Sequence, residues 1–243
     1  MRTLKMYATI SINLIKCNKN LTKSALKFHN RGNPLRAYQS IDDTVIFFMK
    51  KIIGISGARV KATGFEVLDK NETYLFVSNH QSNFDIPLLY TYSPIKMAFV
   101  AKQEMPKIPI MGKLMELRGH IFMNRDNPKD AVKSIQKGIE VLKSGASLAV
   151  FPEGSRSKGK AMGSFKPGAL RLAIKSGVKV VPIVINGSFN LIEANGGRVK
   201  PANVEIRCLN PLDPKNYKDA VKLTEELEII IKNELQQSQS IKE

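Results

Sequence analysis

Hydrophobic and polar positions follow two different patterns along this chain. In residues 1–57, apolar side chains recur at helical spacing among basic ones. From about residue 58, short apolar runs of strand type alternate with helical segments, which predicts an α/β fold. We therefore expect a mixed, mostly parallel central sheet of about seven strands flanked by helices, preceded by an N-terminal amphipathic helical region. The expected division is a helical region at 1–57 and an α/β domain at 58–243.

The expected strands are short apolar runs bounded by turn-forming residues. They cover 59–68, 74–78, 97–101, 120–123, 147–151, 178–185 and 204–209. The clearest helix spans 128–143, where Asp126 or Asn127 can serve as N-cap and an apolar stripe follows the helical period. Further helices are expected over about 167–176 and 219–236. No internal repeat or low-complexity linker interrupts this order.

Charge changes the interpretation of the first segment. The 243-residue chain has a net charge of +17, and residues 1–61 hold twelve Lys or Arg against Asp42 and Asp43 alone. Amphipathic helices rich in basic residues lie in a membrane interface without crossing it. We therefore predict that residues 1–57 form a membrane-interface region on an anionic surface, with a peripheral location at the cytoplasmic face. The alternative is a helix pair packed on the domain with a solvated basic face.

Cysteine and histidine usage predicts neither a disulfide framework nor a metal site. Cys17 and Cys208 are far apart in sequence and form no Cys-x-x-Cys pair. His29, His80 and His120 are dispersed and have no cysteine partners. We expect two reduced thiols, no metal and no cofactor.

The segment 78–85 contains polar side chains suited to catalysis, directly after an expected buried strand. It reads Ser-Asn-His-Gln-Ser-Asn-Phe-Asp and precedes an apolar helix start. His80 and Asp85 would point about 140° apart in one continuous helix, so they can meet only if the chain turns between them. In that case Asp85 can hold one imidazole nitrogen and leave the other as a general base. The alternative is a capped helix start with Asp85 in its first turn.

A second polar segment follows another expected strand. Residues 151–159 read Phe-Pro-Glu-Gly-Ser-Arg-Ser-Lys-Gly. A glycine-bearing loop with hydroxyls and cations suits phosphate binding. The alternative is a basic surface turn.

Together these segments resemble the glycerolipid acyltransferases. Asn79-His80-x-Ser82-x-x-Asp85 looks like the His-x4-Asp motif of that family, and residues 151–157 are similar to its third motif, with Ser155 where Thr is commoner. Phe122-Met123-Asn124-Arg125 resembles the second motif, and Val181-Pro182-Ile183 resembles the fourth. Order and spacing agree over roughly residues 60–210. The size and the basic N-terminal region look most like the bacterial 1-acylglycerol-3-phosphate acyltransferases.

This resemblance implies acyl transfer from a thioester to the free hydroxyl of 1-acylglycerol 3-phosphate (lysophosphatidic acid), which gives phosphatidic acid. His80 is then the general base, oriented by Asp85, and the absence of a Gly-x-Ser-x-Gly motif favours direct attack without an acyl-enzyme. The substrate-binding residues implied by the motifs are Lys102, Arg125, Glu153, Gly154, Ser155 and Arg156. Loop amides near Gly154 are expected to hold the oxyanion.

Some alternatives remain open at this stage. The donor is either acyl-CoA or acyl-carrier protein, since both are anionic. The same chemistry on glycerol 3-phosphate or another lysophospholipid is the second enzymatic hypothesis. A basic module that binds nucleic acid or membrane is the non-enzymatic one. It explains the charge but not the paired motifs, so we expect no specific nucleic-acid partner.

Overall fold

The centre of the molecule is one seven-stranded sheet, with strand order β1-β7-β6-β2-β5-β3-β4. The computed structural model describes residues 1–124 and 127–240, except for the side chains of residues 13–22, 128 and 239–240. The strands are β1 (Arg59–Thr63), β2 (Tyr74–Ser78), β3 (Met97–Lys102), β4 (Ile121–Met123), β5 (Ser147–Val150), β6 (Lys179–Asn186) and β7 (Asn203–Cys208). All neighbouring pairs are parallel except β6 and β7. The expected mostly parallel mixed sheet is confirmed.

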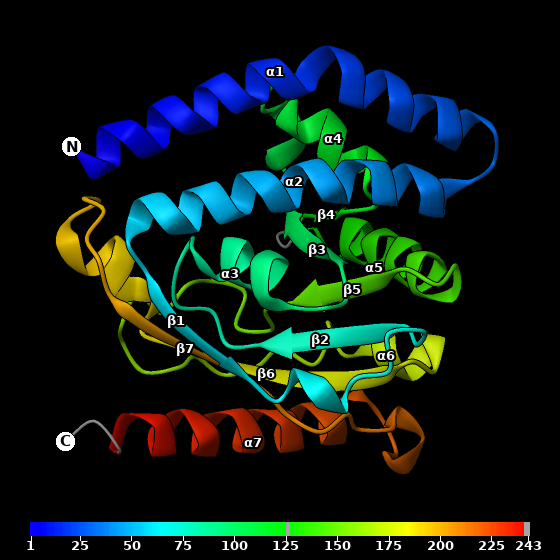
Figure 1. Ribbon diagram of the computed structural model, residues 1–243. Coiled ribbons are helices and arrows are strands. Elements are labelled where there is room, and N and C mark those ends of the chain that lie inside the picture. Colours follow the sequence, from blue (N-terminus) through cyan, green and yellow to red (C-terminus); the bar gives the residue numbers. More distant parts are fainter. Residues whose placement is uncertain (125–126, 241–243) are drawn as a thin grey trace.

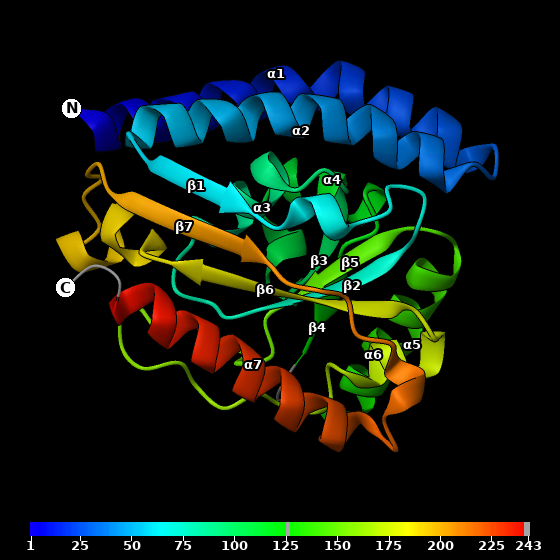
Figure 2. The same cartoon turned by 60° about the horizontal axis from the view of Figure 1, so that its bottom comes forward.

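Helices cover both faces of this sheet (Figures 1 and 2). One face carries α1 (Arg2–Asn30), α2 (Pro34–Ser56), α3 (Asp85–Tyr92) and α4 (Met111–Leu117). The other carries α5 (Pro128–Lys143), α6 (Arg171–Ser176) and α7 (Ala220–Ser240). Two hydrophobic cores follow from these layers. The first lies between β2, β6 and the helices α2 and α3, and the second lies between the same sheet and α5 to α7.

The helices α1 and α2 form an antiparallel pair that lies across the top of the molecule in Figure 1. Asn33 caps α2, with its Oδ1 accepting the Arg36 N–H, and Pro34 occupies the first turn, where its missing N–H costs nothing. The inner face of α2 is part of the core, because Ile41, Ile52 and the neighbouring Ile53 are buried. Within the described residues, none of the helices combines the length and the apolarity that crossing a bilayer requires.

The clearest differences from the sequence-based expectation are a strand end, a helix start and one helix that was not expected. The strand expected over 59–68 ends at Thr63, because Gly64 has a φ of 83° and a Cβ there would lie 2.0 Å from the Cys208 carbonyl oxygen. The helix expected from 167 begins only at Arg171, after a turn. The short helix α4 was not expected at all.

The parallel strands deliver their carboxyl ends to one edge of the sheet. Ser78, Val150 and Asn186 end β2, β5 and β6, which are adjacent and point the same way. Because ligands in open α/β sheets bind at the carboxyl ends of the strands, this edge is where functional side chains are expected. The loops after β2 and β5 carry the two polar segments that the sequence singles out.

Candidate active site

His80 and Asp85 meet at this edge. The chain after β2 turns once, with His80 in the loop and Asp85 as the first residue of α3. The Nδ1 atom of His80 lies 2.7 Å from Oδ2 of Asp85. Because the carboxylate accepts from Nδ1–H, the lone pair of the ring is on Nε2. The turn required for this contact is therefore present, as the motif interpretation predicted.

Asp85 is fully buried and is held by several donors. Its Oδ2 also accepts the backbone N–H groups of Gln81 at 2.7 Å and Ser82 at 2.9 Å, and its Oδ1 accepts the hydroxyl of Ser188 at 2.6 Å. Ser188 lies just after β6, the strand that pairs with β2 on the side away from β5. These contacts fix the plane of the carboxylate, and through it the orientation of the imidazole.

The loop after β5 is tied directly to His80. The buried carboxylate of Glu153 accepts the His80 N–H at 2.6 Å and the Gly163 N–H at 2.8 Å. Burial raises the pKa of Glu153, and these two N–H groups partly oppose that effect. The Ser157 N–H donates to the His80 carbonyl at 2.8 Å. Both oxygens of Glu153 thus hold backbone in place, and its direct contact with substrate stays a prediction.

The imidazole of His80 lines one wall of a cavity of about 650 Å³. Its ring stacks on Phe151, with 4.1 Å between centroids, and Phe99 continues the stack behind it. Apolar side chains of α2 and α3 form much of the remaining wall, among them Val45, Phe48, Met49 and Ile86. A base at the wall of a mostly apolar cavity is suited to a substrate that combines a reactive polar group with a hydrocarbon chain.

Cationic side chains gather at the same cavity. Lys102, Ser155 and Arg156 line it, as does Gly154, which adopts a φ of +79° that favours glycine. Lys158, an exposed residue of the same loop, also lines the cavity.

Two site predictions from the sequence have different outcomes. Arg125 lies outside the described residues, so its role stays a prediction. Loop amides near Gly154 were expected to hold the oxyanion. The amide of Gly154 itself donates to the Phe151 carbonyl at 3.0 Å, because the loop turns there.

Glu193 is a residue that sequence reasoning missed. It lies in a short 3-10 helix after β6, and its carboxylate joins both polar loops. Oε1 accepts from Arg156 Nη1 at 2.9 Å and from the Asn83 N–H at 3.0 Å, and Oε2 accepts from the Ser82 hydroxyl at 2.6 Å. No motif surrounds it, and about 110 residues separate it from the His80 loop. Only the strand order β6-β2 brings them together.

The inner end of the cavity is polar. Asp42 of α2 accepts from Arg118 Nε and from the Tyr90 hydroxyl, and all three side chains are buried. Burial opposes the charge of Arg118, yet Tyr90 and Asp42 raise its pKa. His120 accepts the Phe99 N–H through Nδ1, and burial, together with the charge of Arg118, lowers the pKa of His120 to about 3. This ring is neutral near pH 7 and serves as part of the wall.

Within the described residues, neither a grouped set of metal ligands nor a reactive thiol is present. Among residues 1–124 and 127–240, no three His, Cys, Asp or Glu side chains are grouped so as to hold a metal ion. Cys208 is buried in β7, and burial raises the pKa of its thiol to about 12. A thiol with such a pKa is a poor nucleophile at neutral pH.

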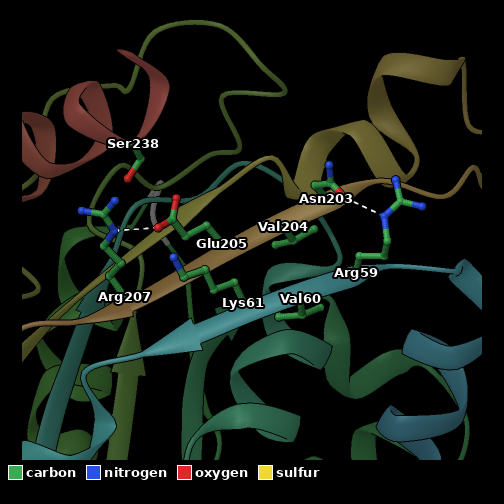
Figure 3. A pocket seen from close by; sticks show the side chains of 8 residues that line it. All are labelled: Arg59, Val60, Lys61, Asn203, Val204, Glu205, Arg207 and Ser238. Atoms are coloured by element: carbon green, nitrogen blue, oxygen red, sulfur yellow. Dashed lines mark hydrogen bonds and ion pairs between the residues drawn. The ribbon is translucent and has the colours of Figure 1, made fainter. Parts of the chain in front are cut away.

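A separate hollow of about 570 Å³ lies at the sheet edge formed by β1 and β7 (Figure 3). Three of the charged groups that line it, Arg59, Glu205 and Arg207, already have partners. Arg207 contacts Glu205 at 2.8 Å and Glu234 at 3.0 Å, and Arg59 donates to Asn203 at 2.7 Å. None of the motif residues lines this hollow, so the chemistry belongs to the cavity at His80.

Comparison with known proteins independently supports a relationship to acyltransferases. The model of the family described as Acyltransferase matches residues 59–186, more than half of the chain. A 1-acyl-sn-glycerol-3-phosphate acyltransferase from Limnanthes douglasii is 32% identical over 68% of this chain, and one from Saccharomyces cerevisiae is 33% identical over 69%. The chloroplastic LPAT1 from Arabidopsis thaliana is 36% identical over 63%. The matched segments span 59%, 55% and 44% of those relatives, less than two thirds of each.

The similarity extends to a solved structure. The 1-acyl-sn-glycerophosphate (LPA) acyltransferase PlsC from Thermotoga maritima superposes with a TM-score of 0.84 at 27% identity. That match covers 98% of this chain and 95% of the other. It therefore includes the N-terminal helices as well as the sheet.

Proposed function

We propose that this chain, which belongs to the acyltransferase family, transfers a fatty acyl group from a thioester to the free hydroxyl of 1-acylglycerol 3-phosphate, giving phosphatidic acid. The observation that carries the proposal is the His80–Asp85 contact at the wall of a mostly apolar cavity that Lys102 and Arg156 also line. The names of the relatives and of the similar structure support the same acceptor.

In this mechanism His80 acts as the general base. Its Nε2 removes the proton of the acceptor hydroxyl as the oxygen attacks the thioester carbon, and a C–O bond forms. Asp85, hydrogen-bonded to Nδ1, stabilises the imidazolium. When the C–S bond breaks, the imidazolium returns its proton to the departing thiolate. Acceptor hydroxyl and thioester are thus converted into ester and thiol.

Direct attack is favoured over an acyl-enzyme. Within the described residues, the ring of His80 has a hydrogen bond to Asp85 and none to a serine or cysteine. A covalent route needs a nucleophile within hydrogen-bond reach of the base. For the oxyanion, the backbone amides of Ser155 and Arg156 are the better donors, since neither has a hydrogen-bond partner in the described part of the chain.

The phosphate of the acceptor is assigned to the cations of the cavity wall. Lys102, Arg156 and Lys158 line the cavity, and Ser155 adds a hydroxyl. Arg156 is half-buried and already positioned by Glu193, so its guanidinium meets the phosphate with little loss of side-chain freedom. Arg125 is proposed as a further contact on motif resemblance alone.

The N-terminal helices are proposed to lie on an anionic membrane surface. The outer face of α1 exposes Leu4 (77%), Tyr7 (54%) and Ile12 (52%), and Lys5 is exposed beside them. Exposed apolar side chains next to cations match the boundary between headgroups and acyl chains. This position brings the cavity close to an acceptor that is itself a membrane lipid.

The deciding experiment incubates the purified chain with lysophosphatidic acid and either acyl-CoA or acyl-carrier protein, and identifies the lipid product by mass. We expect phosphatidic acid, and a loss of about 10²–10⁴-fold in kcat for His80→Ala. His29→Ala, an exposed histidine on α1, is the matched control and should keep full activity. Full turnover by His80→Ala contradicts the mechanism. Product formed only from glycerol 3-phosphate or another lysophospholipid contradicts the acceptor, and no product with any acceptor leaves the non-enzymatic hypothesis.

A further inference from the structure

A second apolar cavity has a volume of about 410 Å³. It lies on the face of the sheet that α5 and α6 cover, whereas most of the wall of the His80 cavity lies on the face that α2 and α3 cover. Its walls come from α5, from the start of α6 and from the ends of β3, β4 and β5. The apolar lining includes Val100, Met123, Ala131, Val132, Ile135 and Leu172. The described part of the chain offers no side chain that fills it.

This second cavity adjoins the catalytic one. Val100, Phe151 and Gly154 line both. Phe151 is the residue on which the His80 ring stacks. The loop after β5 therefore borders both cavities, and the His80 ring stacks on one of the residues that they share.

The outer end of the second cavity is cationic. Lys166 and Arg171 line it, both are exposed, and neither has an ion-pair partner within the described residues. Gly168 lies between them, and a Cβ at that position would have nothing within 4 Å. The mouth is thus open and complementary to an anion.

The proposed reaction requires a site of this kind. In an acyl thioester, the hydrocarbon chain and the thiol-bearing arm leave the reacting carbonyl in different directions. The cavity at His80 accommodates a chain, and the cations Lys102 and Arg156 are assigned to the acceptor phosphate. The arm therefore needs its own channel, which starts where the two cavities adjoin and ends at positive charge.

We propose that the second cavity binds the phosphopantetheine arm of the acyl donor, with Lys166 and Arg171 at its phosphate. This inference rests on the proposed acyl transfer. The arm is a flexible chain with two amide groups and a hydroxyl, and it ends in a phosphate both in coenzyme A and on a carrier protein. An apolar channel with a cationic mouth complements both of its ends.

Two variants test the proposal by different routes. Lys166→Ala/Arg171→Ala removes the charge at the mouth, and Gly168→Phe fills the opening without backbone strain, because Gly168 does not have a positive φ. We expect each to raise the KM for acyl-CoA at least about tenfold, the double alanine variant because it loses charge-assisted contacts and Gly168→Phe because it blocks the opening. The KM for lysophosphatidic acid should stay unchanged. Turnover of the truncated donor acyl-N-acetylcysteamine, which lacks the phosphate, should not respond to the double alanine variant.

The matched control is Lys143→Ala/Lys175→Ala, which removes two exposed cations at the other ends of α5 and α6. This control variant should leave the KM for acyl-CoA and the KM for lysophosphatidic acid unchanged. An unchanged KM for acyl-CoA, or a raised KM for lysophosphatidic acid alone, overturns the proposal. Calorimetric binding of a non-reactive acyl-CoA thioether gives a second measurement. If the unmodified chain transfers no acyl group, the proposed function fails, whereas weaker thioether binding by the double variant still supports the cavity as the arm site.

Discussion

At the scale of single residues, the active site depends on hydrogen-bond donors that come from distant parts of the chain. Asp85 accepts from the His80 ring, from two amides of its own loop and from the hydroxyl of Ser188. The two amides fix the carboxylate relative to its own loop. Among the described residues, Ser188 is the donor that fixes it relative to β6, the strand that Ser188 follows in the chain.

We predict that Ser188→Ala lowers kcat about tenfold with little change in the KM for lysophosphatidic acid. A hydrogen bond to a charged group contributes about 1.5–3 kcal/mol, and a loss of 1.4 kcal/mol in the transition state corresponds to tenfold in rate. Steady-state kinetics measures the effect. The kcat of Ser188→Cys, which keeps a weak hydrogen-bond donor, should lie between those of the unmodified protein and Ser188→Ala.

Ser93→Ala is the control for this variant. Ser93 is equally buried and donates to the Ile95 carbonyl at 2.7 Å, but it lies at the opposite edge of the sheet. Its loss should reduce stability without affecting kcat. If both serine variants lose kcat in the same proportion, the role of Ser188 is structural only.

The residue scale also shows where sequence reasoning stops. His80 and Asp85 were identified because they lie five positions apart in one motif, so the contact between them needs only a local turn. Ser188 and Glu193 follow β6, more than 100 residues away, and have no motif of their own. Their positions depend on β6 pairing with β2, and the strand order was not predictable from a single sequence.

At the scale of elements, α2 is an integral part of the core as well as part of the N-terminal helical region. Its Asp42 contacts Arg118 at the end of α4 and Tyr90 on α3, so one buried carboxylate joins three helices at the inner end of the catalytic cavity. Burying an ion pair costs desolvation of both charges, and removing one partner leaves the other charge uncompensated.

We predict that Asp42→Leu destabilises the protein by about 3–5 kcal/mol, the cost typical of breaking a buried pair. Arg118 is only 3% exposed and has no other carboxylate partner among the described residues. Urea unfolding followed by circular dichroism measures the change.

The double variant Asp42→Leu/Arg118→Met separates the charge effect from the packing effect. Because it removes both charges and keeps similar volumes, it should be more stable than Asp42→Leu alone. If the two substitutions simply add their costs, the ion pair is not the reason for the instability.

Element prediction succeeded where burial is uniform or strictly periodic. The strands β2, β5 and β6 are almost entirely buried, and each gives a continuous apolar run. The helix α5 was predicted with its correct ends, because Asn127 caps it and Pro128 opens it. The helix α4 has only seven residues, too few to establish a period, so no helical pattern indicated it.

At the scale of the whole molecule, the two faces of the sheet differ in what covers them. The face opposite α7 carries α1 and α2 (Figures 1 and 2). The described side chains of α1 are mostly exposed, and side chains of α2 line the catalytic cavity. Deleting the N-terminal helices would remove core residues such as Ile41 and Ile53, so it would not isolate an effect on membrane binding. Substitution of exposed side chains avoids that problem.

We predict that Leu4→Ser/Tyr7→Ser weakens binding to phosphatidylglycerol-rich vesicles at least about tenfold in a sedimentation assay, because even partial burial of two such side chains in the interface is worth more than 1.4 kcal/mol. The control Val221→Ser/Ile229→Ser removes two exposed apolar side chains from α7, on the opposite face, and should bind as the unmodified protein does. Salt should weaken the binding of all three proteins, since the basic residues contribute in each.

Equal binding by both double variants would show that the outer face of α1 does not contact the membrane. A loss of binding only in the α7 variant would place the lipid surface against the other side of the sheet.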